Sequence, residues 1–258
     1  VLRQAQQRRI PTLIQEQNSY AGVTNKLLAR KAERICVAYE GMEKFFPKDK
    51  ILLTGNPVRH SYENLEALRP EALEHFRLHA GRPVILVLGG SLGAGTVNES
   101  IGGAISAIEA SGVQMIWQTG SHWYDRMREA VEEQSARSIM ITGFINRMEL
   151  AYAAADVIIS RAGAGTISEL ALVGKPVILV PSPNVAEDHQ THNAMALVSR
   201  GAALLVKDAD AQRELISTAL ELIGDDAQRA LLSENIKKMA IRDADTVIAR
   251  EVLILARR

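Results

Sequence analysis

Short apolar runs alternate with helical patterns along most of the chain, and this alternation constrains the fold more than any other feature of the sequence. Runs rich in branched aliphatic residues occur at 12–14, 34–38, 51–53, 84–88, 114–117, 139–141, 157–159, 177–180 and 203–206. Helical patterns lie between many of them, at 96–110, 124–134, 148–155, 166–173 and 211–222. Apolar runs without strict alternation are typical of strands buried on both faces, and a strand–helix–strand repeat indicates a parallel sheet with right-handed crossovers. The sequence therefore predicts the α/β class, with a Rossmann-like, doubly wound parallel sheet.

A polar stretch that contains Pro57 and Pro70 separates the third apolar run from the fourth. Such a change in composition indicates a connection between two folded units. We place the boundary near His60. Residues 1–60 are interpreted as the end of one Rossmann-like domain, and residues 61–258 as a complete second domain.

The charge balance and the cysteine content exclude several classes of protein. The chain has 30 basic and 30 acidic side chains, so no overall positive field recruits nucleic acid and we expect no nucleic-acid partner. Cys36 is the only cysteine, which excludes an internal disulfide and fits a reducing compartment. The apolar runs are far shorter than the roughly 20 residues that a membrane-spanning helix requires.

A glycine-rich loop follows the apolar run at 84–88 and precedes a helical pattern. Its sequence, GGSLGAG from Gly89 to Gly95, has no lysine after it, so a P-loop ATPase is excluded, and G-x-G-x-x-G does not fit because Asn98 stands at the last position. Two interpretations remain. The loop approaches the phosphates of a ligand, with Ser91 offering a hydroxyl, or it merely packs a strand tightly against a helix.

A second glycine loop, SRAGAGTISE from Ser160 to Glu169, repeats the arrangement of strand, glycine turn and helix start. Two such loops at the carboxyl ends of parallel strands provide backbone N–H groups and helix N-termini that suit a diphosphate. Glu169 has two readings of equal weight. It completes a capping box with Thr166, or it accepts hydrogen bonds from the vicinal hydroxyls of a ribose.

A polar loop, PSPNVAEDHQTHNA, spans residues 181–194 after the run at 177–180. His189 and His192 are three residues apart, but no third ligand has a supporting spacing, so we predict no metal site. The amides of Gln190 and Asn193 suit the hydroxyls of a sugar, or serve as helix caps.

Six segments in this order resemble the MurG family of bacterial N-acetylglucosaminyltransferases. They are IQEQNSYAGVTNKLLA (14–29), TGNPVR (54–59), LGGSLGA (88–94), GFINRM (143–148), SRAGAGTISEL (160–170) and EDHQTHNA (187–194). The resemblance implies a GT-B architecture of two Rossmann-like domains with the active site between them. It also implies an inverting transfer of N-acetylglucosamine from UDP-N-acetylglucosamine (UDP-GlcNAc) to lipid I, which forms lipid II for peptidoglycan.

The resemblance also implies roles for individual residues. The positions that match the donor site are Asn18, Arg59, Ser91, Ile145, Ala164, Gly165, Thr166, Glu169 and Gln190. Ile145 would pair with uracil through its backbone, Glu169 would hold the ribose, and Gln190 would bind the sugar. Arg59 and Ser91 would contact the diphosphate region, together with the turn at 164–166, and Asn18 would reach the donor from the first domain.

The family's Gly-His segment, which carries the presumed catalytic base, does not occur in this chain. We therefore expect the base to lie upstream of Val1 and this chain to be mainly the donor-binding part, without a catalytic residue of its own. The resemblance implies no cofactor or metal. It places the enzyme on the cytoplasmic face of the bacterial inner membrane, in peripheral contact through the N-terminal domain.

Two alternatives stay open at this point. A UDP-GlcNAc 2-epimerase shares the fold and the donor but isomerises the sugar. A non-catalytic module that binds nucleotide sugars would need the same loops and no base.

Overall fold

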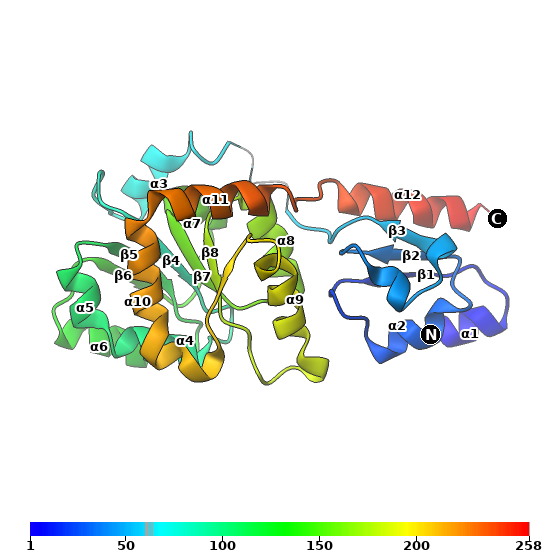
Figure 1. Cartoon of the computed structure of the whole chain (residues 1–258), viewed down its shortest axis with the longest axis horizontal. Coiled ribbons are helices and arrows are strands. Elements are labelled where there is room, and N and C mark those ends of the chain that lie inside the picture. Colours follow the sequence, from blue (N-terminus) through cyan, green and yellow to red (C-terminus); the bar gives the residue numbers. More distant parts are fainter. Residues whose placement is uncertain (60–61, 63, 258) are drawn as a thin grey trace.

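The computed structural model describes residues 1–59, 62 and 64–257, which form two lobes built on separate parallel sheets (Figure 1). The smaller lobe contains a three-stranded sheet of order β1-β2-β3, with β1 (Leu13–Glu16), β2 (Arg34–Val37) and β3 (Ile51–Leu53). The larger lobe contains a six-stranded sheet of order β6-β5-β4-β7-β8-β9. Its strands are β4 (Val84–Leu88), β5 (Gln114–Gln118), β6 (Ile139–Thr142), β7 (Val157–Ser160), β8 (Val177–Leu179) and β9 (Leu204–Leu205).

Helices cover both faces of the larger sheet (Figure 1). One face packs against α3 (Arg69–His75), α7 (Met148–Ala154), α8 (Ala164–Val173), α9 (His189–Val198) and α11 (Asp226–Lys237). The other packs mainly against α4 (Gly95–Gly102), α5 (Ile105–Ala110), α6 (Tyr124–Glu133) and α10 (Ala211–Gly224). Successive residues of β4 enter opposite cores, Ile85 on one side and Leu86 on the other. The predicted doubly wound parallel sheet, buried on both faces, is therefore confirmed.

A strand forms at every apolar run that the sequence indicated, but one helix prediction is wrong. The pattern at 96–110 was expected to form a single helix, whereas the structure has α4 and α5 with Gly103 and Ala104 between them. Gly102 and Gly103 have the low helix propensity that favours a break at this point.

Two segments connect the lobes, one after β3 and one between α11 and α12 (Ala244–Ala256). Helix α12 returns to the smaller lobe, where Arg34 Nε lies 3.1 Å from Glu251 Oε2. The same lobe also contains α1 (Leu2–Gln7) and α2 (Val23–Ala29). The boundary predicted near His60 falls outside the described residues, so the division at this residue stays a prediction. The stretch assigned to the second domain includes a helix that packs beside the first sheet.

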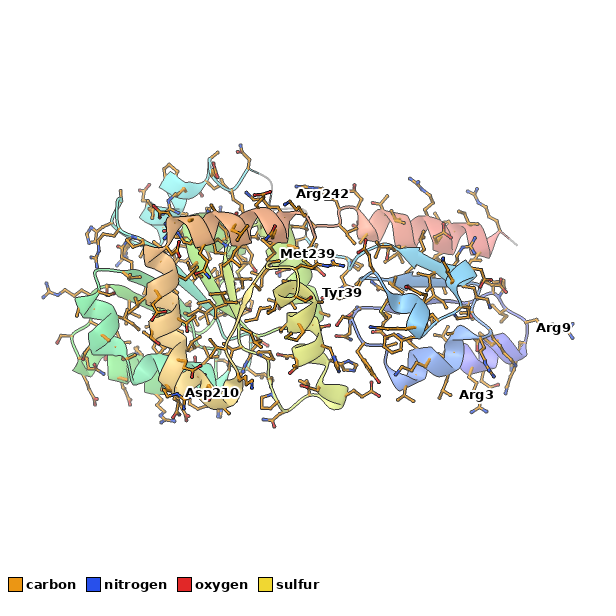
Figure 2. All side chains as sticks on the ribbon, viewed as in Figure 1. Arg3, Arg9, Tyr39, Asp210, Met239 and Arg242 are labelled. Carbon is orange, nitrogen blue, oxygen red and sulfur yellow. The ribbon has the colours of Figure 1, made fainter. Side chains whose placement is uncertain are left out.

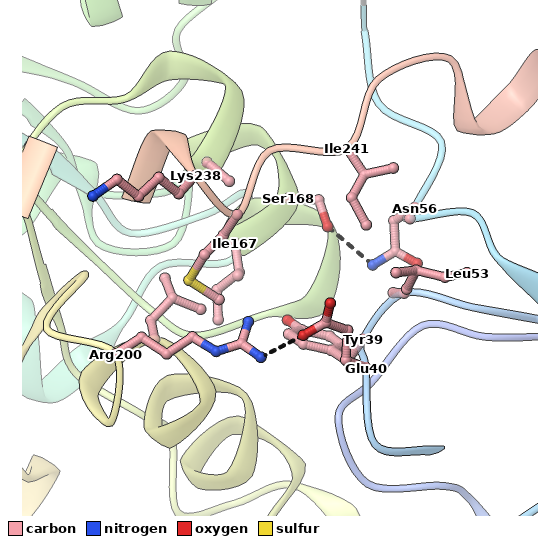
Figure 3. Close-up of a pocket in the computed structure, with 14 residues that line it drawn as sticks. Tyr39, Glu40, Leu53, Asn56, Ile167, Ser168, Arg200, Lys238 and Ile241 are labelled. Atoms are coloured by element: carbon pink, nitrogen blue, oxygen red, sulfur yellow. Dashed lines mark hydrogen bonds and ion pairs between the residues drawn. The ribbon is translucent and has the colours of Figure 1, made fainter. Parts of the chain in front are cut away.

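Polar contacts join the two lobes around a cavity of about 130 Å³ (Figure 3). Asn56 Nδ2 donates to Ser168 Oγ at 3.1 Å, and Arg200 Nη2 lies 2.9 Å from Glu40 Oε2. Figure 2 shows Tyr39 and Met239 at this junction. The segment around Asn56 is therefore fixed against α8, the helix that carries Glu169.

Candidate functional site

The strand order places the two glycine loops side by side. The chain leaves β4 for β5 and β6 on one side, and then returns to β7, which pairs with β4 on the other side. Such a reversal opens a crevice beyond the carboxyl ends of the two central strands, where α/β proteins bind ligands. The loops after β4 and β7 form the walls of this crevice.

An open cavity of about 210 Å³ lies at this edge of the sheet. Its lining includes five residues that the sequence placed in the donor site, namely Arg59, Ser91, Ile145, Thr166 and Glu169. Leu88, Gly89, Gly90, Gln118, Phe144, Met148, Tyr152, Ser160 and Arg161 complete the lining. Residues from β4, β5, β7, α7 and α8 and from four loops thus converge on one concave site.

The glycines of the first loop have two different functions. A Cβ on Gly93 would lie 2.4 Å from the carbonyl oxygen of Thr119, and one on Gly120 would lie 2.2 Å from the Gly93 nitrogen. These glycines permit close packing between the loops after β4 and β5, whereas the sequence suggested packing of a strand against a helix. Gly90 also has a positive φ, of +75°, but differs because a Cβ there would meet nothing within 4 Å. The backbone beside Ser91 therefore faces open space in the cavity.

The second loop leads directly into α8, which begins two residues before Thr166. Gly163 is the N-cap residue and no side chain caps the helix. Thr166 therefore lies inside the first turn, and Glu169 lies in the second turn. The capping-box reading of Glu169 is wrong because the helix starts earlier than the spacing suggested.

Glu169 instead faces the cavity beside Tyr152 of α7. Tyr152 donates its hydroxyl to Glu169 Oε2 at 3.4 Å. Burial, and secondarily the negative charge of Glu169, hold the pKa of the Tyr152 hydroxyl well above its usual range. The tyrosine therefore stays a neutral donor at physiological pH, and Glu169 retains acceptor capacity for a ligand.

Ile145 lies in the loop after β6, where it is buried and lines the cavity. Within the described part of the chain, neither its N–H nor its C=O forms a hydrogen bond. This leaves one donor and one acceptor side by side, the pattern that a base with adjacent N–H and C=O groups requires.

Asn18 and Gln190 lie beyond the second loop and do not line this cavity. Gln190 Oε1 accepts from the backbone N–H groups of Ala162, at 3.2 Å, and Ser182, at 2.9 Å. Asn193 is buried, and its Nδ2 donates to Asn18 Oδ1 at 3.0 Å and to the Ala162 carbonyl at 3.3 Å. Both amides of α9 thus hold the second loop in place, and neither caps the helix.

His189 and His192 have different partners, although both rings lie near Tyr20 of the smaller lobe. His192 stacks on Tyr20 of the smaller lobe with ring centroids 4.8 Å apart, whereas His189 Nε2 lies 3.5 Å from Glu187 Oε2. Among the residues that the structure describes, no group of three or more His, Cys, Asp or Glu side chains could hold a metal ion. Over the same residues, no helix has both the length and the hydrophobicity needed to cross a membrane.

Several cavity residues were missed by the sequence reasoning. Phe144 directly precedes Ile145 in GFINRM, and Arg161 lies in SRAGAGTISEL three residues before Ala164, so their place in these motifs was an available signal. Tyr152 lies in a helix whose surroundings are almost entirely apolar, and nothing in its local pattern distinguished it from core.

Comparisons with known proteins agree with this geometry. Residues 84–248 match the family model described as "Glycosyltransferase family 28 C-terminal domain". A curated relative from Parabacteroides distasonis is 54% identical over 250 residues, covering 96% of this chain and 68% of the relative. Its name is UDP-N-acetylglucosamine--N-acetylmuramyl-(pentapeptide) pyrophosphoryl-undecaprenol N-acetylglucosamine transferase. The chain spans about two thirds of the length of such relatives.

Solved structures give the same result. The crystal structure of MurG from Acinetobacter baumannii superposes with a TM-score of 0.73 at 30% identity, covering 96% of this chain and 68% of that one. UDP-GlcNAc 2-epimerase from Neisseria meningitidis, solved with UDP-GlcNAc, has a TM-score of 0.68 at 16% identity, covering 98% of this chain and 72% of that one. Because the identity is so low, this likeness shows a shared fold alone. The chain belongs to glycosyltransferase family 28 and, within it, to the MurG family.

Proposed function

We propose that this chain forms the donor-binding part of an inverting transferase that moves N-acetylglucosamine from UDP-GlcNAc to lipid I. The observation that carries the proposal is the cavity at the junction of β4 and β7. It gathers Arg59, Ser91, Ile145, Thr166 and Glu169 from four separate segments of the chain. Family membership supplies the reaction, and the cavity supports the place of the donor.

Each part of the donor has a matching group in or beside the cavity. The free backbone pair of Ile145 suits the adjacent N–H and C=O of uracil. Glu169 suits the ribose hydroxyls, which are donors to a carboxylate. The sugar would extend toward Asn18 and Gln190, which are linked to the second loop through Ala162.

The diphosphate is the leaving group, and its charge must be stabilised as the glycosidic bond breaks. The N-termini of α4 and α8, each preceded by a glycine loop, direct partial positive charge toward the carboxyl edge of the sheet. Arg59, with Ser91 and Thr166, adds charge and donors at the same place. This arrangement stabilises a departing UDP through fixed dipoles and the cationic side chain of Arg59.

The remaining partners follow from the same proposal. The acceptor is lipid I, which is anchored in the membrane, so the enzyme acts as a peripheral protein on the cytoplasmic face of the bacterial inner membrane. The proposal includes no cofactor.

Calorimetric titration with UDP and ADP tests the donor assignment. We expect UDP to bind and ADP to bind at least tenfold more weakly, because the backbone pair at Ile145 is left unsatisfied by adenine. Equal affinities would remove the basis for a uracil site. Incubation of a longer MurG relative with UDP-GlcNAc alone separates the alternatives, since an epimerase would release a new sugar nucleotide and a transferase needs its acceptor.

A further inference from the structure

We propose that Asp208 is a positioning residue that joins the two glycine loops and directs the guanidinium of Arg161 toward the diphosphate of the donor. Asp208 belongs to a short turn at Asp208–Asp210, after the edge strand β9 and before α10. Nothing in its local sequence marks it as part of a site. The inference rests on the donor cavity proposed above and concerns a residue that contacts the cavity lining without being part of it.

The two carboxylate oxygens of Asp208 contact different loops. Oδ2 accepts a hydrogen bond from Thr96 Oγ1 at 2.9 Å, and Thr96 is the second residue of α4, just after the first loop. Oδ1 pairs with Nη1 of Arg161, which directly follows β7 and opens the second loop. One side chain therefore connects the helix after β4 to the loop after β7.

Arg161 is held on one edge only. Its Nη1 also donates to the carbonyl oxygen of Val180 at 3.0 Å and contacts that of Pro181 at 3.4 Å. In the described part of the chain, its Nε and Nη2 groups have no hydrogen-bond partner, and Arg161 lines the cavity. An anchored guanidinium with a free edge has lost most of its rotamer freedom before a ligand arrives, which favours binding of a planar or anionic oxygen group.

Electrostatics alone predicts that Asp208 weakens UDP binding, the opposite of what a positioning role predicts. A carboxylate close to a diphosphate repels it, so removal of that charge would tighten UDP binding if charge were all that mattered. The Asp208 and Arg161 side chains are each only 18% exposed, so neither is fully screened by water. The sign of the change in UDP affinity therefore distinguishes positioning from charge.

The test uses Asp208→Ala, Asp208→Asn and, as a matched control, Asp210→Asn. Asp210 is in the same turn, but its carboxylate pairs with the exposed Arg213 at 2.8 Å, and it lies at the edge of the larger lobe (Figure 2). We expect Asp208→Ala to raise the Kd for UDP about tenfold and to leave the Kd for uridine within about twofold. Asp208→Asn, which keeps neutral acceptor capacity, should recover part of the loss, and Asp210→Asn should change neither Kd.

Calorimetry, with uridine measured by displacement of UDP, gives both constants. Unchanged or tighter UDP binding by a folded Asp208→Ala variant would overturn the inference, as would an equal loss for uridine and UDP. If that variant does not fold, Thr96→Val provides the test, because it removes the hydrogen bond from Thr96 to Asp208. It should raise the Kd for UDP about threefold without affecting the Kd for uridine, and no change would refute the role. Failure of the unmodified chain to bind either ligand would instead refute the donor cavity itself.

Discussion

Replacement of Glu169 by Gln is expected to weaken UDP binding about tenfold. The substitution preserves shape and one acceptor oxygen but removes the charge, and it replaces the other acceptor by a donor. Hydrogen bonds to a charged group are roughly twice as strong as neutral ones, so losing that advantage at two ribose hydroxyls costs about 1–2 kcal/mol. This free energy corresponds to about a tenfold change in Kd.

The structure indicates that the folded state tolerates this change. The Glu169 carboxylate accepts a long hydrogen bond from the Tyr152 hydroxyl, at 3.4 Å, and a Gln oxygen can still accept it. Since Glu169 does not cap α8, the helix loses no capping interaction. We therefore expect the free energy of unfolding to change by less than about 1 kcal/mol, so that the effect on affinity is a direct one.

The assay is calorimetric titration of both forms with UDP and with 2′-deoxy-UDP, alongside urea unfolding. The unmodified chain should discriminate against the deoxy ligand, and Glu169→Gln should discriminate less. Glu149→Gln is the matched control, because Glu149 of α7 pairs with Arg147, the residue before that helix, and does not line the cavity. Unchanged affinity and unchanged discrimination in a folded Glu169→Gln variant would show that Glu169 does not bind the ribose.

The remaining predictions concern the packing of the loops and the smaller lobe. Gly93→Ala should lower the free energy of unfolding by about 3 kcal/mol, because the new Cβ clashes with the Thr119 carbonyl and the φ of this residue is +90°. Gly90→Ala should lower it by only about 1–2 kcal/mol, because the positive φ is its sole cost. Comparable losses for the two variants in urea unfolding would contradict this difference. Cys36 should resist alkylation in the folded chain, since its side chain is fully buried and desolvation raises its pKa to about 11; rapid modification without denaturant would refute that burial. Because folding raises this pKa from 9.0, the contribution of the protonated Cys36 thiol to the free energy of unfolding should be complete below pH 9 and decline toward pH 11. A Cys36→Ala variant should lack this component of the pH dependence.

Local patterns in the sequence determined the strands and the class of fold. A strand buried on both faces needs a continuous run of branched aliphatic residues, and this requirement is independent of which strand lies beside it, so each apolar run could be recognised alone. The two glycine loops were recognisable for the same reason, because each directly follows such a run. Helix boundaries were less secure, as the break at Gly103 and the early start of α8 show.

Only the tertiary structure decided which of these loops meet and what supports them. The pairing of β4 with β7 brings Ser91 and Thr166 to one cavity, although they are 75 positions apart in the chain. Tyr152 acquires its contact from the next helix along the chain, Asp208 from a helix far away in the sequence, and α12 returns to a sheet formed by the first residues of the chain. Periodicity reports the environment of a residue along its own strand or helix, whereas these contacts depend on the order and packing of elements, which no local pattern contains.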